Sequence, residues 1–273
     1  MPHRLPHAIS VAVLASLTLA AAAQAQTSSE RRDFCPDRPG KGSPSCVVDV
    51  GVVQAELGAF DASFRRSGPG STETYSVGDV QVRFGLTPMM EGQVLWTPYI
   101  QIRDRFEGQT TRTDGVGDLT FALRRSLKNP DGSGFSVALQ PFVSAPTGKS
   151  GIGAGGWQGG LIAPVSIPLG GDLSLGLAPE IDLLADSDGH GTHWGWAGAA
   201  GLSKPVGPVT LGLELWAAVD DDPAERVTQA SIDLTIAWAP AGHEDLQFDA
   251  GLYGGLTKET PDLAIGVGLS RRF

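Results

Sequence analysis

The chain has 273 residues, of which 30 are acidic and 20 basic, giving a formal net charge of −10 at neutral pH. Such an acidic excess argues against a nucleic-acid partner. Hydrophobic residues make up 41% of the chain, but after residue 25 they never form the run of about 18 that a transmembrane helix requires.

The first 25 residues are predicted to be a secretory signal peptide. Arg4 provides a weakly positive start, residues 8–23 are apolar, and the Ala-Gln-Ala sequence at 23–25 is a small-x-small cleavage site. The mature chain is therefore expected to begin near Gln26. It is long enough for one large all-β domain.

Both cysteines lie early, and the ten residues between Cys35 and Cys46 are rich in proline, glycine and serine. In an exported chain such a pair is predicted to close one disulfide loop. A metal site is less favoured because no histidine lies nearby. Residues 26–46 are therefore expected to be a periplasmic lead-in, stapled by the disulfide, before the first strand.

From residue 47 onward, apolar and polar residues alternate with the two-residue period of a β-strand. In the last segment, Leu263, Ile265 and Val267 share one face, glycines and small residues occupy the other, and the chain ends on Phe273. Twelve such segments are predicted, over residues 47–60, 72–86, 91–105, 115–127, 134–145, 156–169, 172–185, 193–204, 208–219, 227–239, 245–256 and 262–273.

The connections between these segments alternate in character. Those after even-numbered segments are short, such as residues 170–171, whereas those after odd-numbered segments tend to be longer or more polar, such as 65–71, 106–114 and 146–155. An up-and-down barrel of the outer membrane has short periplasmic turns and longer extracellular loops. The sequence therefore predicts an all-β fold over residues 47–273, a transmembrane up-and-down antiparallel β-barrel of about 12 strands.

The polar faces of these segments carry many charges, which a soluble barrel would turn outward. In a membrane barrel they face the lumen, and the apolar faces meet lipid. Tryptophans on the apolar faces or near segment ends suit an interfacial belt, although a soluble, lipocalin-like binder with a tryptophan-filled core stays open. The belt candidates are Trp96, Trp157, Trp194, Trp196 and Trp238, and the candidate lumen charges are Glu56, Asp79, Arg83, Arg103, Asp118, Arg124, Glu180, Asp182, Glu214, Asp233 and Asp249.

These charges are unevenly distributed along the chain. Arg83, Arg103 and Arg124 belong to the second, third and fourth segments, whereas Glu180, Asp182, Glu214, Asp233 and Asp249 belong to the seventh to eleventh. We therefore predict a transverse electric field across the lumen.

Three other motifs were weighed for chemistry. Gly151-x-Gly153-x-x-Gly156 matches a dinucleotide fingerprint, but it precedes a strand and not a helix, so a surface loop is the better interpretation. The side chains of Asp186, Asp188, His190 and His193 could hold a metal ion, although polar loop composition explains them as well. The triplet at 220–222 is interpreted as an acidic loop tip. No cofactor is expected.

The mature chain resembles the outer-membrane transporter family named for the meta-pathway of phenol degradation. The resemblance rests on residues 117–127 and 140–170, above all the Pro-Thr-Gly at 146–148 before a glycine-rich loop, and on the terminal Phe273. It implies an outer-membrane barrel that passes small, aromatic or hydrophobic, molecules passively. Arg271 departs from the pattern, because such strands usually carry an apolar residue at that lipid-side position.

A chain of this kind is expected in the bacterial outer membrane and not to be an enzyme. Its expected partners are outer-membrane lipid and lipopolysaccharide, a small-molecule solute, and the barrel assembly machinery, which would read Phe273 as its signal. Two alternatives remain: a closed barrel with a structural role, and an outer-membrane lipase that uses His193. No G-x-S-x-G nucleophile motif occurs in the chain.

Overall fold

The computed structural model describes residues 31–273, of which Asp33–Phe273 form one compact unit. The predicted signal peptide lies outside the described residues. Between residues 31 and 273, no helix is long and apolar enough to cross a membrane.

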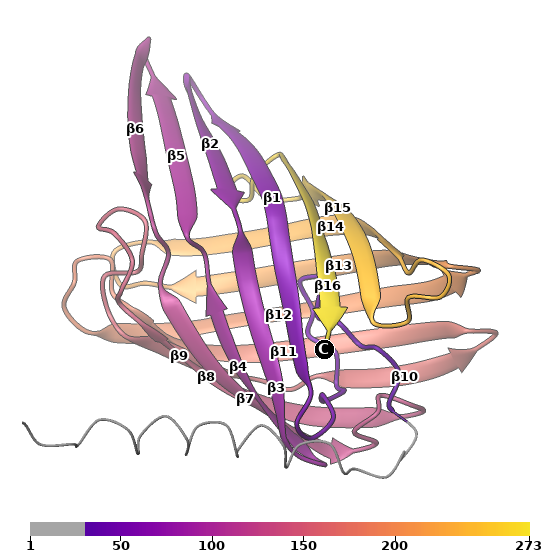
Figure 1. Cartoon of the computed structure of the whole chain (residues 1–273). Helices are drawn as coiled ribbons and strands as arrows, with labels where there is room; N and C mark the ends of the chain where they lie inside the picture. The colour runs from indigo at the N-terminus through magenta and orange to yellow at the C-terminus, as the bar shows by residue number, and fades with distance from the viewer. Residues whose placement is uncertain (1–30) are drawn as a thin grey trace, which may run out of the picture. The chain divides into compact units, whose positions relative to one another are not determined.

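The unit is an antiparallel β-sheet that closes on itself, because β16 pairs with β1 (Figure 1). Four of its twelve barrel strands are each split in two, by breaks at Gly78, 97–98, 116–118 and 163–164; two of these breaks contain prolines, which cannot donate to the ladder. The predicted twelve-stranded barrel is thus confirmed. The strands are β1 (Val53–Ser67), β2 (Gly70–Val77), β3 (Asp79–Thr87), β4 (Met90–Trp96), β5 (Tyr99–Phe106), β6 (Gln109–Gly115), β7 (Leu119–Lys128), β8 (Ser136–Ala145), β9 (Gln158–Ile162), β10 (Val165–Gly170), β11 (Leu173–Ala185), β12 (Thr192–Val206), β13 (Val209–Asp221), β14 (Arg226–Trp238), β15 (Leu246–Gly255) and β16 (Leu263–Arg272).

The barrel is polar inside and apolar outside. Its largest fully buried side chains include Arg83, Arg124, Glu56 and Glu91, whereas apolar side chains such as Leu234 are about half exposed. This inversion is what a barrel surrounded by lipid requires. The five predicted belt tryptophans are all exposed, at between 38% and 63%.

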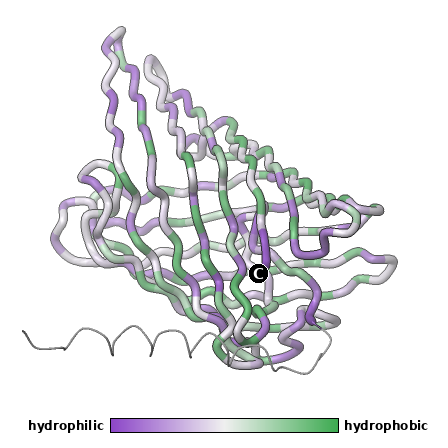
Figure 2. Tube along the Cα trace, in the orientation of Figure 1, coloured by the Kyte–Doolittle hydropathy of each residue, from purple (hydrophilic) through white to green (hydrophobic). Residues whose placement is uncertain are grey.

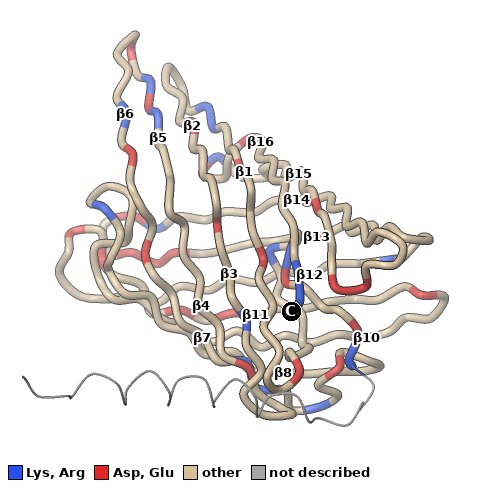
Figure 3. Tube along the Cα trace, viewed as in Figure 1, with Lys and Arg blue, Asp and Glu red and all other residues tan. Residues whose placement is uncertain are grey.

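The predicted long loop at 106–114 is wrong. Glu107 and Gly108, with φ angles of 48° and 79°, form the tight two-residue turn of a β-hairpin. Strand β6 continues the ladder from Gln109. Purple and white prevail toward the tip of the β5–β6 hairpin in Figure 2, and charges of both signs lie along it in Figure 3. The alternation is lost because β6 has no apolar side chain on either face.

The first predicted segment also differs from the structure at its start. β1 begins at Val53 rather than at residue 47, and it continues to Ser67. Residues 47–52 belong with the lead-in, where Val48 donates its backbone N–H to Glu91.

The last strand closes the barrel as its alternation predicts, with Leu263, Ile265 and Val267 exposed.

Candidate functional site

The candidate site is the lumen, where a loop of the lead-in spans the interior. We call residues 35–46, which the Cys35–Cys46 disulfide closes, the internal loop. It contacts inward-facing side chains on several sides of the barrel: Ser45 Oγ lies 2.7 Å from Ser136 on β8, and Gly42 N–H donates to Glu214 on β13. Residues 35–46 of the lead-in, which was predicted only to precede the barrel, thus lie within it.

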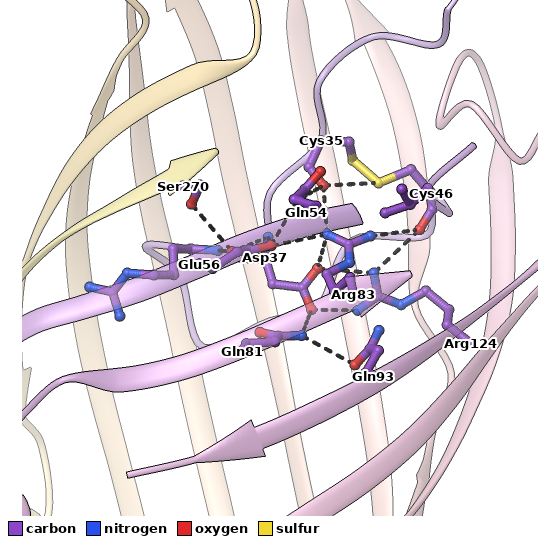
Figure 4. Close-up of polar contacts among 12 residues, drawn as sticks. Cys35, Asp37, Cys46, Gln54, Glu56, Gln81, Arg83, Gln93, Arg124 and Ser270 are labelled. Carbon is purple, nitrogen blue, oxygen red and sulfur yellow. Dashed lines mark hydrogen bonds and ion pairs between the residues drawn. A yellow bond between two sulfur atoms is a disulfide. The ribbon is translucent and has the colours of Figure 1, made fainter. Parts of the chain in front are cut away.

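One side of the internal loop is anchored to two buried arginines (Figure 4). Arg124 forms a bidentate pair with Asp37, with nitrogen–oxygen distances of 2.9 and 2.6 Å. Arg83 lies 2.8 Å from Asp37, 3.2 Å from Glu56 and 2.9 Å from Glu91. Both guanidinium groups are fully buried, so two arginines pair with three carboxylates away from water, and the carboxylates are in excess by one charge.

The charge state of Asp37 follows from these neighbours. Burial raises the pKa of its carboxyl, but the positive charges of Arg124 and Arg83 outweigh burial and lower the pKa to about 2. Asp37 is therefore ionised at neutral pH. Its carboxylate acts as a permanent anchor for the internal loop.

The opposite side of the loop meets acidic residues of β13, β14 and β15. Glu214 accepts hydrogen bonds from the backbone N–H groups of Lys41 and Gly42, at 2.8 and 3.1 Å. Lys41 Nζ lies 3.3 Å from Asp233, and Arg38 lies 3.1 Å from Asp249. The internal loop therefore places its negative charge against the arginines and its positive charges against the acids.

Glycines of β1 and β16 make room for Arg38. Gly58 and Gly268 face each other in the β1–β16 ladder, and a Cβ added to either would meet the Arg38 guanidinium. At Gly268 it would also meet the backbone carbonyl of Leu57, which cannot move aside. Glycine is therefore required on the inward face of the last strand because a larger side chain would collide with Arg38 and the backbone of Leu57.

We expect Gly268→Ala to lower the free energy of unfolding by about 1–3 kcal/mol, the usual cost of overpacking. The matched control is Gly176→Ala on β11, where the added Cβ would meet only a carbonyl oxygen at 3.9 Å. Urea unfolding of both variants in lipid bilayers measures the difference. If Gly268→Ala and Gly176→Ala were equally stable, Arg38 would not pack as closely against Gly268 as the structure places it.

The other predicted lumen charges lie outside two clusters: the buried arginines Arg83 and Arg124 with their carboxylates, and the acidic residues Glu214, Asp233 and Asp249 that meet the internal loop. Arg103 pairs with Glu73 at 3.6 Å on the β2–β5 ladder and is partly exposed, so it does not join Arg83 and Arg124. Asp118 accepts N–H groups of Gly148 and Ala154 and fastens the loop after β8. Asp79 accepts a hydrogen bond from Thr97, and Glu180 and Asp182 occupy alternate positions on β11.

Sequence reasoning missed the residues that connect the clusters. Asp37, Arg38 and Lys41 lie between the two cysteines, and Glu91 is the second residue of β4. The available signal was the loop itself, because three charges among the ten residues between the cysteines need partners once the segment is enclosed. Their partners lie up to 211 residues away in the chain, and no local pattern reports such pairings.

Cavities lie on both sides of the internal loop. One, of about 370 Å³, is lined by Lys41, Trp216, Tyr253, Gln229 and Ile265, among others. The other, of about 400 Å³, is lined by residues of the loop and by inward-facing residues of β10 to β15. The loop therefore separates two spaces that are each large enough for a small molecule.

In the structure, the ring of His193, one of the predicted metal ligands, lies between two carboxylates. His193 Nδ1 lies 2.8 Å from Asp186 and its Nε2 lies 2.6 Å from Asp220. Both ring nitrogens thus face carboxylates, and neither is turned toward a hydroxyl nucleophile, as a lipase mechanism needs. Over residues 31–273, no group of three or more His, Cys, Asp or Glu is placed to hold a metal ion.

Comparison with known proteins agrees with this architecture. A family model described as “Putative MetA-pathway of phenol degradation” matches residues 36–273. An outer membrane channel from Pseudomonas putida F1 is similar in structure, with a TM-score of 0.68 at 16% identity, over 86% of this chain and 99% of that one. The beta domain of a Bordetella autotransporter has a TM-score of 0.55 at 11% identity, over 82% and 100%. No protein with a curated description matches the sequence. At these identities, the structural likeness shows the fold alone.

Proposed function

We propose, from the premise that the chain belongs to the family described as “Putative MetA-pathway of phenol degradation”, that it is an outer-membrane channel through which small molecules pass passively. The observation that carries this proposal is a lipid-facing barrel whose polar lumen holds a cavity on each side of one internal loop. The structural likeness to an outer membrane channel supports it. The barrel needs no enzymatic activity for this role.

The solutes we propose are small and aromatic or hydrophobic. Trp216 and Tyr253 line the cavity of about 370 Å³ beside the internal loop, and their flat aromatic rings suit an aromatic solute. The family description, which mentions phenol degradation, points the same way.

The transverse field remains part of the proposal, in a changed form. Arg83 and Arg124 lie on β3 and β7, whereas Glu214, Asp233 and Asp249 lie on β13 to β15. The charges of the internal loop are complementary to both sides and therefore offset much of this field while the loop lies in the lumen.

The outer membrane is the proposed surrounding, with lipid and lipopolysaccharide against the apolar band. Phe273 is 62% exposed, and its backbone N–H donates to Val53 at the start of β1. A terminal aromatic at the barrel seam supports its role as the signal for the barrel assembly machinery. Arg271 lies beside it, 5.3 Å from the ring centroid, and keeps its charge at the interface.

Uptake into proteoliposomes tests the function. We expect the full mature chain to speed the entry of small aromatic solutes more than that of aliphatic solutes of equal size, and least that of a large polar sugar. Protein-free liposomes of the same lipid give the background. If uptake equals the background for every solute and single-channel recordings stay silent, the barrel is a closed structural protein.

A further inference from the structure

The ammonium group of Lys41 lies in a cage built by three neighbouring strands. Its Nζ lies 3.3 Å from Asp233 Oδ2 and donates a hydrogen bond to Ser231 Oγ. The ring centroids of Trp216 and Tyr253 lie 4.5 and 5.1 Å from the same nitrogen. A carboxylate beside two aromatic faces is the environment in which proteins bind organic ammonium ions.

The register of the sheet brings the cage together without the lead-in. Trp216 on β13 pairs with Ser231 on β14, and Asp233 on β14 pairs with Tyr253 on β15. Because alternate positions of one strand share a face, Ser231 and Asp233 both point into the lumen. The cage is therefore part of the barrel wall, and Lys41 is a separate occupant carried in by the internal loop.

Asp233 has binding capacity that Lys41 does not use. Its side chain is completely buried, Oδ2 accepts from Ser231 and pairs with Lys41, and Oδ1 has no hydrogen-bond partner among the described residues. Leaving a buried carboxylate oxygen unpaired costs free energy. An incoming N–H donor that reached this oxygen would remove that cost.

The cage also opens onto free space. Lys41, Trp216, Ser231 and Tyr253 all line the cavity of about 370 Å³, and the Lys41 side chain is 31% exposed. The cavity can hold the body of a small molecule whose charged end enters the cage. The cage is thus a pocket with an entrance and not a sealed ion pair.

We propose that Trp216, Ser231, Asp233 and Tyr253 form a binding site for the ammonium group of small aromatic or alkyl amines, and that Lys41 is a built-in competitor for it. The proposal rests on the proposed function, and it specifies that the preferred solutes are organic cations that carry an ammonium group. Neutral solutes of the same shape lack the pairing with Asp233, and anionic solutes are repelled by it.

Calorimetric titration of the detergent-solubilised mature protein tests the site. The probes are benzylammonium and its neutral analogue benzyl alcohol. We expect benzylammonium to bind Lys41→Ala about tenfold more tightly than the wild type, because the competitor is gone. Adding Asp233→Asn should weaken that binding by about tenfold or more, since hydrogen bonds to charged groups contribute most.

Two further variants keep the test decisive. Lys41→Met removes the charge but keeps the length of the side chain, in case alanine loosens the internal loop. Lys128→Ala is the matched control, because its ammonium also lies over an aromatic ring, that of Phe135 at 5.0 Å, but on exposed residues outside the lumen. It should leave binding unchanged.

Three outcomes would overturn the site: equal affinity for benzylammonium and benzyl alcohol, no tightening in either Lys41 variant, or no loss with Asp233→Asn. Because binding is measured without a membrane, it is separable from transport. A protein that binds amines but moves no solute refutes the channel and keeps the site. A protein that moves aromatic solutes but shows no preference for amines refutes only the site.

Discussion

Arg83→Ala is expected to lower the free energy of unfolding of the barrel by about 3–5 kcal/mol, the cost of removing one partner from a buried ion pair. The Arg83 guanidinium is completely buried and holds Glu91 in a bidentate pair at 2.9 and 3.1 Å. It also contacts Glu56 and Asp37. Without it, Asp37 and Glu91 keep Arg124 as an ion-pair partner, and Glu56 loses the arginine with which it is paired. Urea unfolding in lipid bilayers, with the heat-dependent gel shift as a second readout, measures the loss.

The matched control is Arg103→Ala, which removes another arginine that the sequence assigned to the lumen. Its ion pair with Glu73 spans 3.6 Å and the side chain is 36% exposed, so the expected cost is about 0–1 kcal/mol. Arg83→Lys should fall between the two, because it keeps the charge and loses the bidentate geometry. If the two alanine variants were equally stable, the buried cluster would not hold the barrel together.

Deleting residues 34–46 is expected to raise the single-channel conductance several-fold in planar bilayers. The internal loop touches β1, β3, β7, β8, β13, β14 and β15 through hydrogen bonds and ion pairs, and it separates the two lumen cavities. Removing it joins these spaces. The barrel strands keep all their ladder hydrogen bonds.

A second variant separates blockage from anchoring. Replacing residues 36–45 by glycine and serine keeps the length of the loop and the Cys35–Cys46 disulfide, but it removes Asp37, Arg38 and Lys41. A loop without these charges should leave and re-enter the lumen, and the current should switch between small and large levels. An unchanged conductance in the deletion would show that ions do not pass the internal loop.

The strand faces were predictable because their cause is local. Alternation along a strand sends Leu263, Ile265 and Val267 to one side whatever the rest of the chain does, and in this protein that side is the lipid face. The same logic predicted the inward positions of Arg83 and Asp233. It failed at residues 106–114, because β6 has no apolar side chain and the two-residue period therefore carries no signal there.

The sequence by itself thus determined most of the strands, which of their faces is apolar, the number of barrel strands and the cysteine pair. Only the tertiary structure decided that the disulfide-closed segment lies inside the barrel, with Asp37 on the arginines of β3 and β7 and with Arg38 and Lys41 on the acids of β14 and β15. The physical reason is that periodicity records each residue's preference for lipid or water. Which opposite charges meet in a closed lumen depends on residues far apart in the chain, because Asp37 and Arg124 are 87 residues apart and Arg38 and Asp249 are 211 apart.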